Sequence, residues 1–146
     1  MRPLVSIVMP CFNAASHLDR SVGSVLAQDS SDWQLLIVDD GSTDDSWHQL
    51  ELLAVRDPRI TVMRQSNAGA AAARNRGLDA ATGQLIAFLD ADDTWEPDFV
   101  SSMSAALLAH PEAGIAYCGW QNIGLGGGRD RPFVPPDYET DNKPDA

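Results

Sequence analysis

The chain has 146 residues, with 21 acidic and 10 basic side chains, and its formal net charge is -11. This charge argues against nucleic acid or an anionic membrane surface as a partner, because both select basic surfaces. The length is that of one domain, which can bury about 68–70% of its unfolded surface in a single core.

Cysteine usage and the first apolar run indicate a cytoplasmic protein. Cys11 and Cys118 lie far apart and match no metal-binding spacing, as expected for reduced residues of a cytosolic chain. The apolar run at residues 4–9 is too short for a signal peptide or a membrane span. We therefore expect no membrane span in this part of the protein.

Strand and helix patterns alternate along the chain. Short apolar runs, several of them rich in β-branched residues, predict strands at residues 4–9, 33–38, 60–63, 85–89 and 115–118. Apolar residues at helical spacing predict helices from Ser16 to about 27, from about Trp47 to Asp57, from Ala70 to Ala81 and from about Phe99 to His110. We expect Thr82-Gly83 to close the third helix. Strands alternating with helices imply an α/β fold with right-handed crossovers and a mostly parallel sheet.

The periodic pattern stops after Trp120. A glycine-rich stretch at 124–128 is followed by prolines and a polar, acidic end. We therefore expect residues 1–120 to form the folded unit and residues 121–146 to form a poorly ordered tail.

The stretch 84–97 reads QLIAFLDADDTWEP and places three carboxylates directly after the fourth predicted strand. Its run of five apolar residues is typical of a strand buried on both faces of a parallel sheet. Asp90, Asp92 and Asp93 then lie at its carboxyl end, where open α/β sheets bind ligands. Clustered carboxylates favour a hard divalent cation, Mg²⁺ or Mn²⁺. The alternative is a turn in which Asp93 or Thr94 caps the next helix, with Pro97 in its first turn.

A second acidic segment, Asp39-Asp40-Gly41-Ser42, follows the second predicted strand. The first strand leads into Pro10-Cys11-Phe12-Asn13 and carries no G-x-G-x-x-G motif, so the phosphate-binding turn of dinucleotide enzymes is missing. A G-x-x-x-x-G-K motif is also missing, and the only lysine is Lys143.

A single motif of this chain resembles another family that has an acidic crevice. LIAFLDADDT is similar to the apolar strand and D-x-D-x-T of haloacid-dehalogenase-like phosphotransferases, which would make Asp90 the nucleophile and Asp92 the acid/base, with Mg²⁺. That family also needs a downstream lysine, and none precedes the tail at 121–146, where the only lysine, Lys143, lies. Its motif normally opens the chain.

Four segments between Val5 and Trp120 resemble family 2 of the nucleotide-sugar-dependent glycosyltransferases. They are VSIVMPCFNAASHLDRSVGSVLAQ, LLIVDDGSTDDS, NAGAAAARNRGLDAATG and IAFLDADDTWEP, in the order and spacing of that family. The resemblance implies a Rossmann-like GT-A sheet with helices on both faces. It also implies that the chain holds the donor-binding half of a longer, here truncated, enzyme.

The resemblance implies a nucleotide pocket at the first two strand ends. There Pro10, Cys11, Phe12 and Asn13 would line the pocket, with Phe12 beside the base. Asp40, next to Asp39, would accept hydrogen bonds from a uracil ring or ribose. The alternatives are an ordinary core aromatic at Phe12 and a simple turn before a helix cap at Asp39-Asp40.

The resemblance further implies that Asp92 binds the metal, Asp90 binds the ribose or a metal-bound water, and Asp93 supports them. Arg74 and Asn75 would lie near the diphosphate, although a solvated helical arginine would look the same in sequence. The Mn²⁺ or Mg²⁺ ion would act as a Lewis acid on the leaving nucleoside diphosphate.

The expected reaction is the transfer of a sugar to a glycan or lipid-linked acceptor, and the expected donor is a UDP-sugar. The reaction would serve the synthesis of a glycan or a cell-surface polysaccharide. The catalytic residue is unknown, because the base of this family is expected beyond residue 146. A nucleotide-binding fragment that does not turn over is the second possibility.

Overall fold

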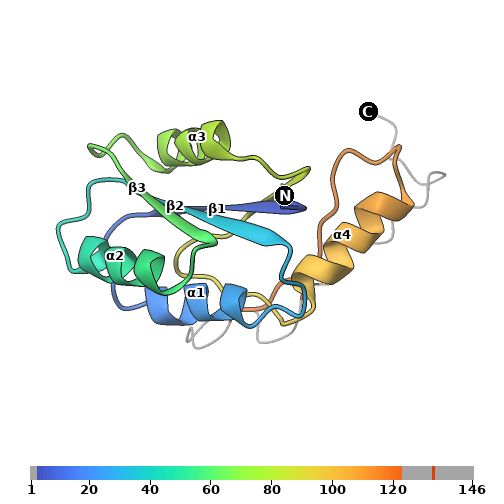
Figure 1. Cartoon of the computed structure of the whole chain (residues 1–146), viewed down its shortest axis with the longest axis horizontal. Coiled ribbons are helices and arrows are strands. Elements are labelled where there is room, and N and C mark those ends of the chain that lie inside the picture. Colours follow the sequence, from blue (N-terminus) through green and yellow to red (C-terminus); the bar gives the residue numbers. More distant parts are fainter. Residues whose placement is uncertain (1–2, 123–132, 134–146) are drawn as a thin grey trace.

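The computed structural model describes residues 3–122 and residue 133. Within this part of the chain, strands and helices alternate (Figure 1). The elements are β1 Val5–Cys11, α1 Leu18–Leu26, β2 Trp33–Asp39, α2 Ser46–Arg56, β3 Ile60–Arg64, α3 Ala70–Ala80, β4 Leu85–Phe88 and α4 Phe99–Ala109.

The four strands form one parallel sheet in the order β3-β2-β1-β4. Because the strands are parallel, their carboxyl ends all lie at the same end of the sheet. Figure 1 shows α3 over one face of the sheet and α1 and α2 over the other. The expected parallel α/β sheet with helices on both faces is therefore confirmed.

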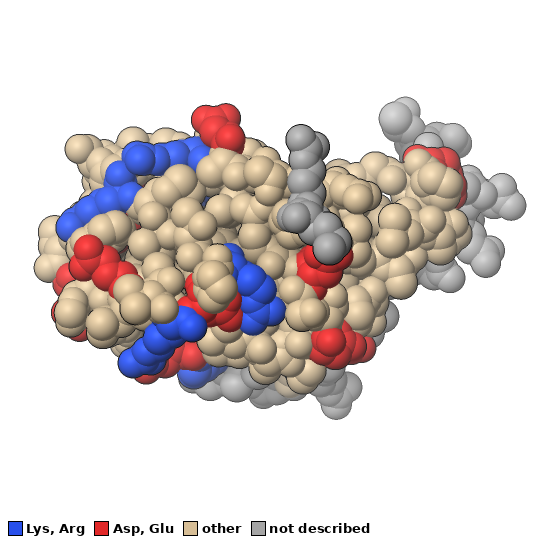
Figure 2. Space-filling view, viewed as in Figure 1, with Lys and Arg blue, Asp and Glu red and all other residues tan. Residues whose placement is uncertain are grey.

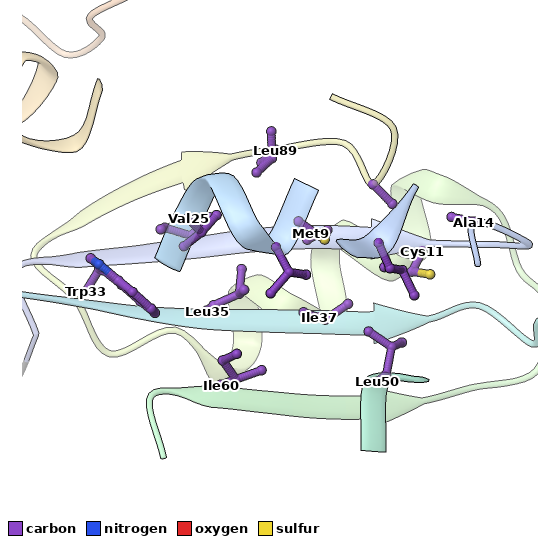
Figure 3. Close-up of a cluster of buried hydrophobic side chains, with 14 of the residues drawn as sticks. Met9, Cys11, Ala14, Val25, Trp33, Leu35, Ile37, Leu50, Ile60 and Leu89 are labelled. Atoms are coloured by element: carbon purple, nitrogen blue, oxygen red, sulfur yellow. The ribbon is translucent and has the colours of Figure 1, made fainter. Parts of the chain in front are cut away.

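The core lies between the sheet and the helices on the side of α1. Strands β1 and β2 are almost completely buried, because they occupy the centre of the sheet and have a neighbour on either side. Figure 3 shows Met9, Leu35 and Ile37 in this cluster. Helix α1 adds three fully buried apolar side chains, Leu18, Val22 and Val25. Each such side chain stabilises the fold by about 1.5–3 kcal/mol.

Helix α3 ends at Ala80, and Gly83 serves a different purpose from the helix closure that we predicted. Gly83 is not among the glycines with positive φ in the described residues. A Cβ on Gly83 would lie only 2.6 Å from the backbone nitrogen of Ser6, and Gly83 N donates to Ser6 Oγ at 2.8 Å. The glycine therefore allows the chain to pass close to β1 before it enters β4.

Strand β4 is not buried on both faces, so that prediction was wrong. Ile86 and Phe88 are 40% and 49% exposed, whereas Leu85 and Ala87 pack against the core. Phe88 is the register partner of Val8, whose side chain faces α3 at Gly77. Helix α3 lies across β1 and β2, so the same face of β4 stays uncovered.

The fifth predicted strand is also wrong. Residues 115–118 form no strand, and Ile115 and Tyr117 are 81% and 61% exposed. A short apolar run becomes a strand only when another strand offers it a hydrogen-bonding edge, and this segment pairs with none of the four strands. Nearby, Trp120 and Phe133 form an isolated antiparallel bridge.

Helix α4 begins later than the capping hypothesis predicted. Its N-cap is Asp98, with no side-chain capping bond, so neither Asp93 nor Thr94 caps it and Pro97 precedes it. Gln28, which follows α1, contacts this region: its side-chain amide donates to Glu96 O at 2.7 Å and accepts from Val100 N at 2.8 Å. Gln28 thus bridges the segment before Phe99 and the first turn of α4.

The prediction of a poorly ordered tail at 121–146 falls almost entirely outside the described residues. Among the helices of the described part, none has the length and apolar character needed to cross a membrane.

Candidate functional site

The two acidic segments follow strands that end at the same end of the sheet. Asp39 ends β2 and is the register partner of Cys11, which ends β1. Asp40 N donates to Cys11 O at 2.8 Å, so the two strand ends are in direct contact. Figure 2 shows basic and acidic side chains close together at the left of the molecule, where the strands end in Figure 1. The site itself is of mixed charge, because Arg64 pairs with Asp39 and Arg74 pairs with Asp90.

Asp39 is completely buried and paired with a cation. Its carboxylate lies 3.0 Å from Nε of Arg64 and accepts the N–H of Ser42 at 3.3 Å on each oxygen. A buried carboxylate needs such partners, because removing its hydration is costly. The pairing leaves Asp39 no surface that a ligand could reach.

Asp40 is only 2% exposed, and three N–H donors bind its carboxylate. Oδ1 accepts from Gln65 Nε2 at 2.8 Å and from Ala68 N at 2.9 Å, and Oδ2 accepts from Gly69 N at 2.8 Å. Desolvation by burial raises the pKa of Asp40, but the hydrogen bonds outweigh it and hold that pKa below its ordinary value. Asp40 thus stays ionised and ties the end of β2 to the start of α3.

The last two residues of β1 have little or no exposed surface. Cys11 is 1% exposed and lies in the core cluster, as Figure 3 shows. Burial and the charge of Asp39 raise the pKa of the Cys11 thiol to about 11, so it is a neutral, unreactive thiol. Pro10 is half-buried beside Val38. Neither residue offers a ligand a charged group.

Phe12 and Asn13 are exposed where the chain leaves β1. Phe12 is 51% exposed, so it is not an ordinary core aromatic. Asn13 has a φ of 49°, a conformation that asparagine adopts more readily than most residues. Its side-chain oxygen accepts the N–H groups of Thr43 and Asp44 at 2.8 and 3.3 Å. Asn13 thus joins the loop after β1 to the loop after β2.

The end of β4 carries one paired and two exposed carboxylates. Arg74 Nη2 of α3 lies 2.5 Å from Asp90 Oδ1. Asp92 and Asp93 are exposed, and Asp93 N donates to Asp90 O at 3.0 Å in a turn. The structure therefore places Arg74 at this acidic turn, paired with Asp90. Asn75 is exposed on α3.

The carboxylates of the acidic turn repel one another. Partial desolvation, and then the charges of Asp92 and Asp90, raise the pKa of Asp93. This repulsion is what a divalent cation would relieve. Among the described residues, no group of three or more His, Cys, Asp or Glu side chains is arranged to hold a metal ion.

Two residues of this site were not predicted from the sequence. Arg64 and Gln65 follow the β3 pattern and carry no motif, yet they bind Asp39 and Asp40. The only signal that could have identified them is strand pairing, since Asp39 and Arg64 are register partners.

A comparison with known proteins matches this chain to a protein family. The family model described as glycosyl transferase family 2 matches residues 6–143. A Bacillus subtilis protein named putative teichuronic acid biosynthesis glycosyltransferase TuaG is 44% identical over 98 residues, which is 66% of this chain and 39% of that protein. Escherichia coli WcaA, named a putative colanic acid biosynthesis glycosyl transferase, is 43% identical over 113 residues, 75% of this chain and 38% of that protein.

A comparison with solved structures shows which proteins share this fold. The chain matches a Pyrobaculum calidifontis mannosyltransferase in complex with GDP-Man and Mn²⁺, with a TM-score of 0.72 and 26% identity over 84% of this chain and 36% of the other. It also matches S. aureus TarS in complex with UDP-GlcNAc, with a TM-score of 0.68 and 25% identity over 76% of this chain and 32% of the other. The chain thus spans less than two fifths of the length of each of these proteins.

Proposed function

Because this chain belongs to glycosyl transferase family 2, we propose that it binds a nucleotide-sugar donor at the carboxyl ends of β1, β2 and β4. The longer protein would transfer the sugar to an acceptor in polysaccharide synthesis, as the names of TuaG and WcaA suggest for those relatives. The observation that carries the proposal is the placement of the Asp40 and Asp90–Asp93 segments at one end of a parallel sheet. The family match favours this function over the haloacid-dehalogenase-like alternative.

We propose that the nucleoside binds against the ends of β1 and β2. The exposed ring of Phe12 offers a surface on which a base can pack. Asp40 has one hydrogen bond on Oδ2 and two on Oδ1, so Oδ2 keeps a lone pair for a base or ribose donor. Pro10, Cys11, Asn13 and Asp39 would act by shaping this pocket.

The diphosphate would lie between the acidic turn and α3. In the proposal Asp92 is the main metal ligand, with Asp90 and Asp93 beside it, and Mn²⁺ or Mg²⁺ is the cation. When bound, the cation supplies positive charge to the departing diphosphate. Arg74 carries a planar guanidinium suited to phosphate oxygens, and its pairing with Asp90 holds it next to this place.

We assign no catalytic base among the described carboxylates. The matches cover only 39% of TuaG and 38% of WcaA, and we propose that the base and the acceptor site belong to the part of such proteins that this chain does not match. The acceptor would be a glycan or a lipid-linked sugar. The cytoplasmic location expected from the two cysteines stays a prediction.

Calorimetric titration of UDP, GDP and ADP, each with Mn²⁺ and with EDTA, tests the proposal. We expect UDP to bind most tightly and only with the cation, because without it the diphosphate faces Asp90, Asp92 and Asp93. Asp92→Asn should weaken UDP binding by about tenfold or more, about 1.4 kcal/mol, and leave thermal stability unchanged.

Asp19→Asn is the matched control, because Asp19 is an exposed carboxylate in the first turn of α1. Equal UDP affinity in EDTA and in Mn²⁺ would contradict the role of the acidic turn. Tighter binding of GDP than of UDP would show that the base assignment is wrong.

A further inference from the structure

Arg64, the last residue of β3, holds two consecutive parts of the loop that follows β2. Its Nε lies 3.0 Å from Asp39 Oδ2, and its Nη2 donates to Ser42 O at 3.0 Å. The guanidinium also lies 5.2 Å from the centre of the Trp47 ring in α2. One side chain thus contacts the strand end, the loop and the next helix.

These contacts hold the loop at Ser42, through both its backbone N–H and its backbone carbonyl. Ser42 N donates to the Asp39 carboxylate, while Ser42 O accepts from Arg64. Ser42 Oγ in turn accepts from Asn13 N at 2.9 Å. Gly41 lies between the two anchors with a φ of 74°, so the turn is sharp and its direction depends on both ends being held.

Asp40 lies inside this loop, between the two residues that Arg64 binds. The position of its carboxylate therefore depends on how Asp39 and Ser42 are held, as well as on its own bonds to Gln65, Ala68 and Gly69. Arg64 binds the two groups through different nitrogens, Nε and Nη2, which its guanidinium holds in one plane, whereas a lysine would have to reach both groups from a single nitrogen.

We propose that Arg64 is a positioning residue for nucleoside binding: it touches no nucleotide, and it orients the Asp40 segment through Asp39 and Ser42. The expected effect of Arg64 on UDP affinity rests on the proposed function. Its effect on the loop itself does not depend on any ligand.

The experiment compares Arg64→Lys and Arg64→Met with the unmodified chain. The first readout is hydrogen exchange of the Thr43 and Asp44 amides, which Asn13 Oδ1 protects, measured without nucleotide. The second is the affinity for UDP with Mn²⁺, together with its ratio to the affinity for GDP. Arg76→Met is the control, because Arg76 is an exposed arginine on α3.

For Arg64→Lys we expect near-normal thermal stability, because a cation still faces Asp39. We also expect faster exchange of both amides and a smaller preference for UDP over GDP. The affinity for UDP should be about tenfold weaker, which corresponds to the loss of one charge-assisted hydrogen bond. Arg64→Met should show larger changes of the same kind. Arg76→Met should show none.

Unchanged amide exchange and unchanged UDP affinity in folded Arg64→Lys would overturn the inference, even if Arg64→Met does not fold. If the unmodified chain binds no nucleoside diphosphate at all, the proposed function fails. The exchange comparison then still decides whether Arg64 positions the loop.

Discussion

At the scale of the residue, Asp39 and Asp40 are neighbours that are stabilised by different chemistry. Asp39 points to a guanidinium, whereas Asp40 is bound only by neutral N–H groups. Hydrogen bonds to a carboxylate are about twice as strong as neutral ones, so three of them can hold a buried charge. The bonds from Ala68 and Gly69 also place this charge at the positive end of α3.

The depressed pKa of Asp40 predicts a loss of stability in acid. A carboxyl whose folded pKa lies below its unfolded value, here 3.8, contributes its full stability above that value and loses it as the pH falls through the folded pKa. We expect Asp40→Asn to lower the free energy of unfolding by about 1–3 kcal/mol near neutral pH, because one amide cannot accept all three bonds. Below pH 3.8 the difference should shrink.

Urea unfolding of both proteins across this pH range would measure the effect. Asp45→Asn is the control, because Asp45 is exposed and makes no side-chain capping bond to α2. The control should change stability by less than about 0.5 kcal/mol. A difference between wild type and Asp40→Asn that is constant with pH would show that the charge of Asp40 is not what stabilises the loop.

At the scale of the element, the contact between α3 and β1 sets the height of α3 above the sheet. A Cβ on Gly77 would lie 2.5 Å from Val8 Cγ1, and both residues are buried. A glycine inside a helix ordinarily weakens it. Here it brings α3 close enough for Gly69 N and Ala68 N to reach Asp40, and so it couples helix packing to the site.

The two glycines Gly77 and Gly23 provide a matched test of this contact. We expect Gly77→Ala to destabilise the fold by about 1–2 kcal/mol, because overpacking outweighs the gain in helix propensity. Gly23→Ala in α1 should stabilise it by about 0.5–1 kcal/mol, since nothing lies within 4 Å of the added Cβ.

Thermal or urea unfolding of both variants would measure these changes. Adding Val8→Ala to Gly77→Ala should recover part of the loss, because the small side chain removes the clash. A stabilising Gly77→Ala would mean that α3 can move away from the sheet at no cost.

At the scale of the whole molecule, charge and uncovered apolar surface are both unevenly placed. The net charge of -11 is spread over a chain with only 10 basic side chains, several of which pair within the described part. On β4, by contrast, Ile86 and Phe88 remain exposed beside the sheet edge. Charge repulsion opposes the compact state, and it also limits association through this apolar face.

The net charge predicts that salt stabilises the fold. Raising NaCl from about 10 mM to about 150 mM shortens the screening distance from about 30 Å to about 8 Å, so the repulsion between acidic groups falls. We expect the melting temperature to rise by a few degrees in the presence of EDTA. Choline chloride should act as NaCl does, because screening depends on ionic strength and not on the cation. A melting temperature that falls with salt would show that the ion pairs outweigh the repulsion.

The sequence by itself determined the order of strands and helices through Phe99–Ala109, the parallel sheet, and the acidic ends of β2 and β4. Each of these depends on local patterns: apolar runs, helical spacing, and acidic residues directly after a strand. The resemblance of four segments to one family was likewise a property of linear order, and the family match bears it out.

Only the tertiary structure decided which groups meet. Arg64 and Gln65 reach the aspartates because β3 pairs with β2, and Arg74 reaches Asp90 because α3 crosses the sheet. The exposed face of β4, the missing strand at 115–118 and the failure of Asp93 or Thr94 to cap α4 have the same cause. Neighbours that are distant in sequence decide whether an apolar run is covered by a helix or paired in a sheet. They also contact the segment before a helix, as Gln28 does before α4, and no local pattern encodes their position.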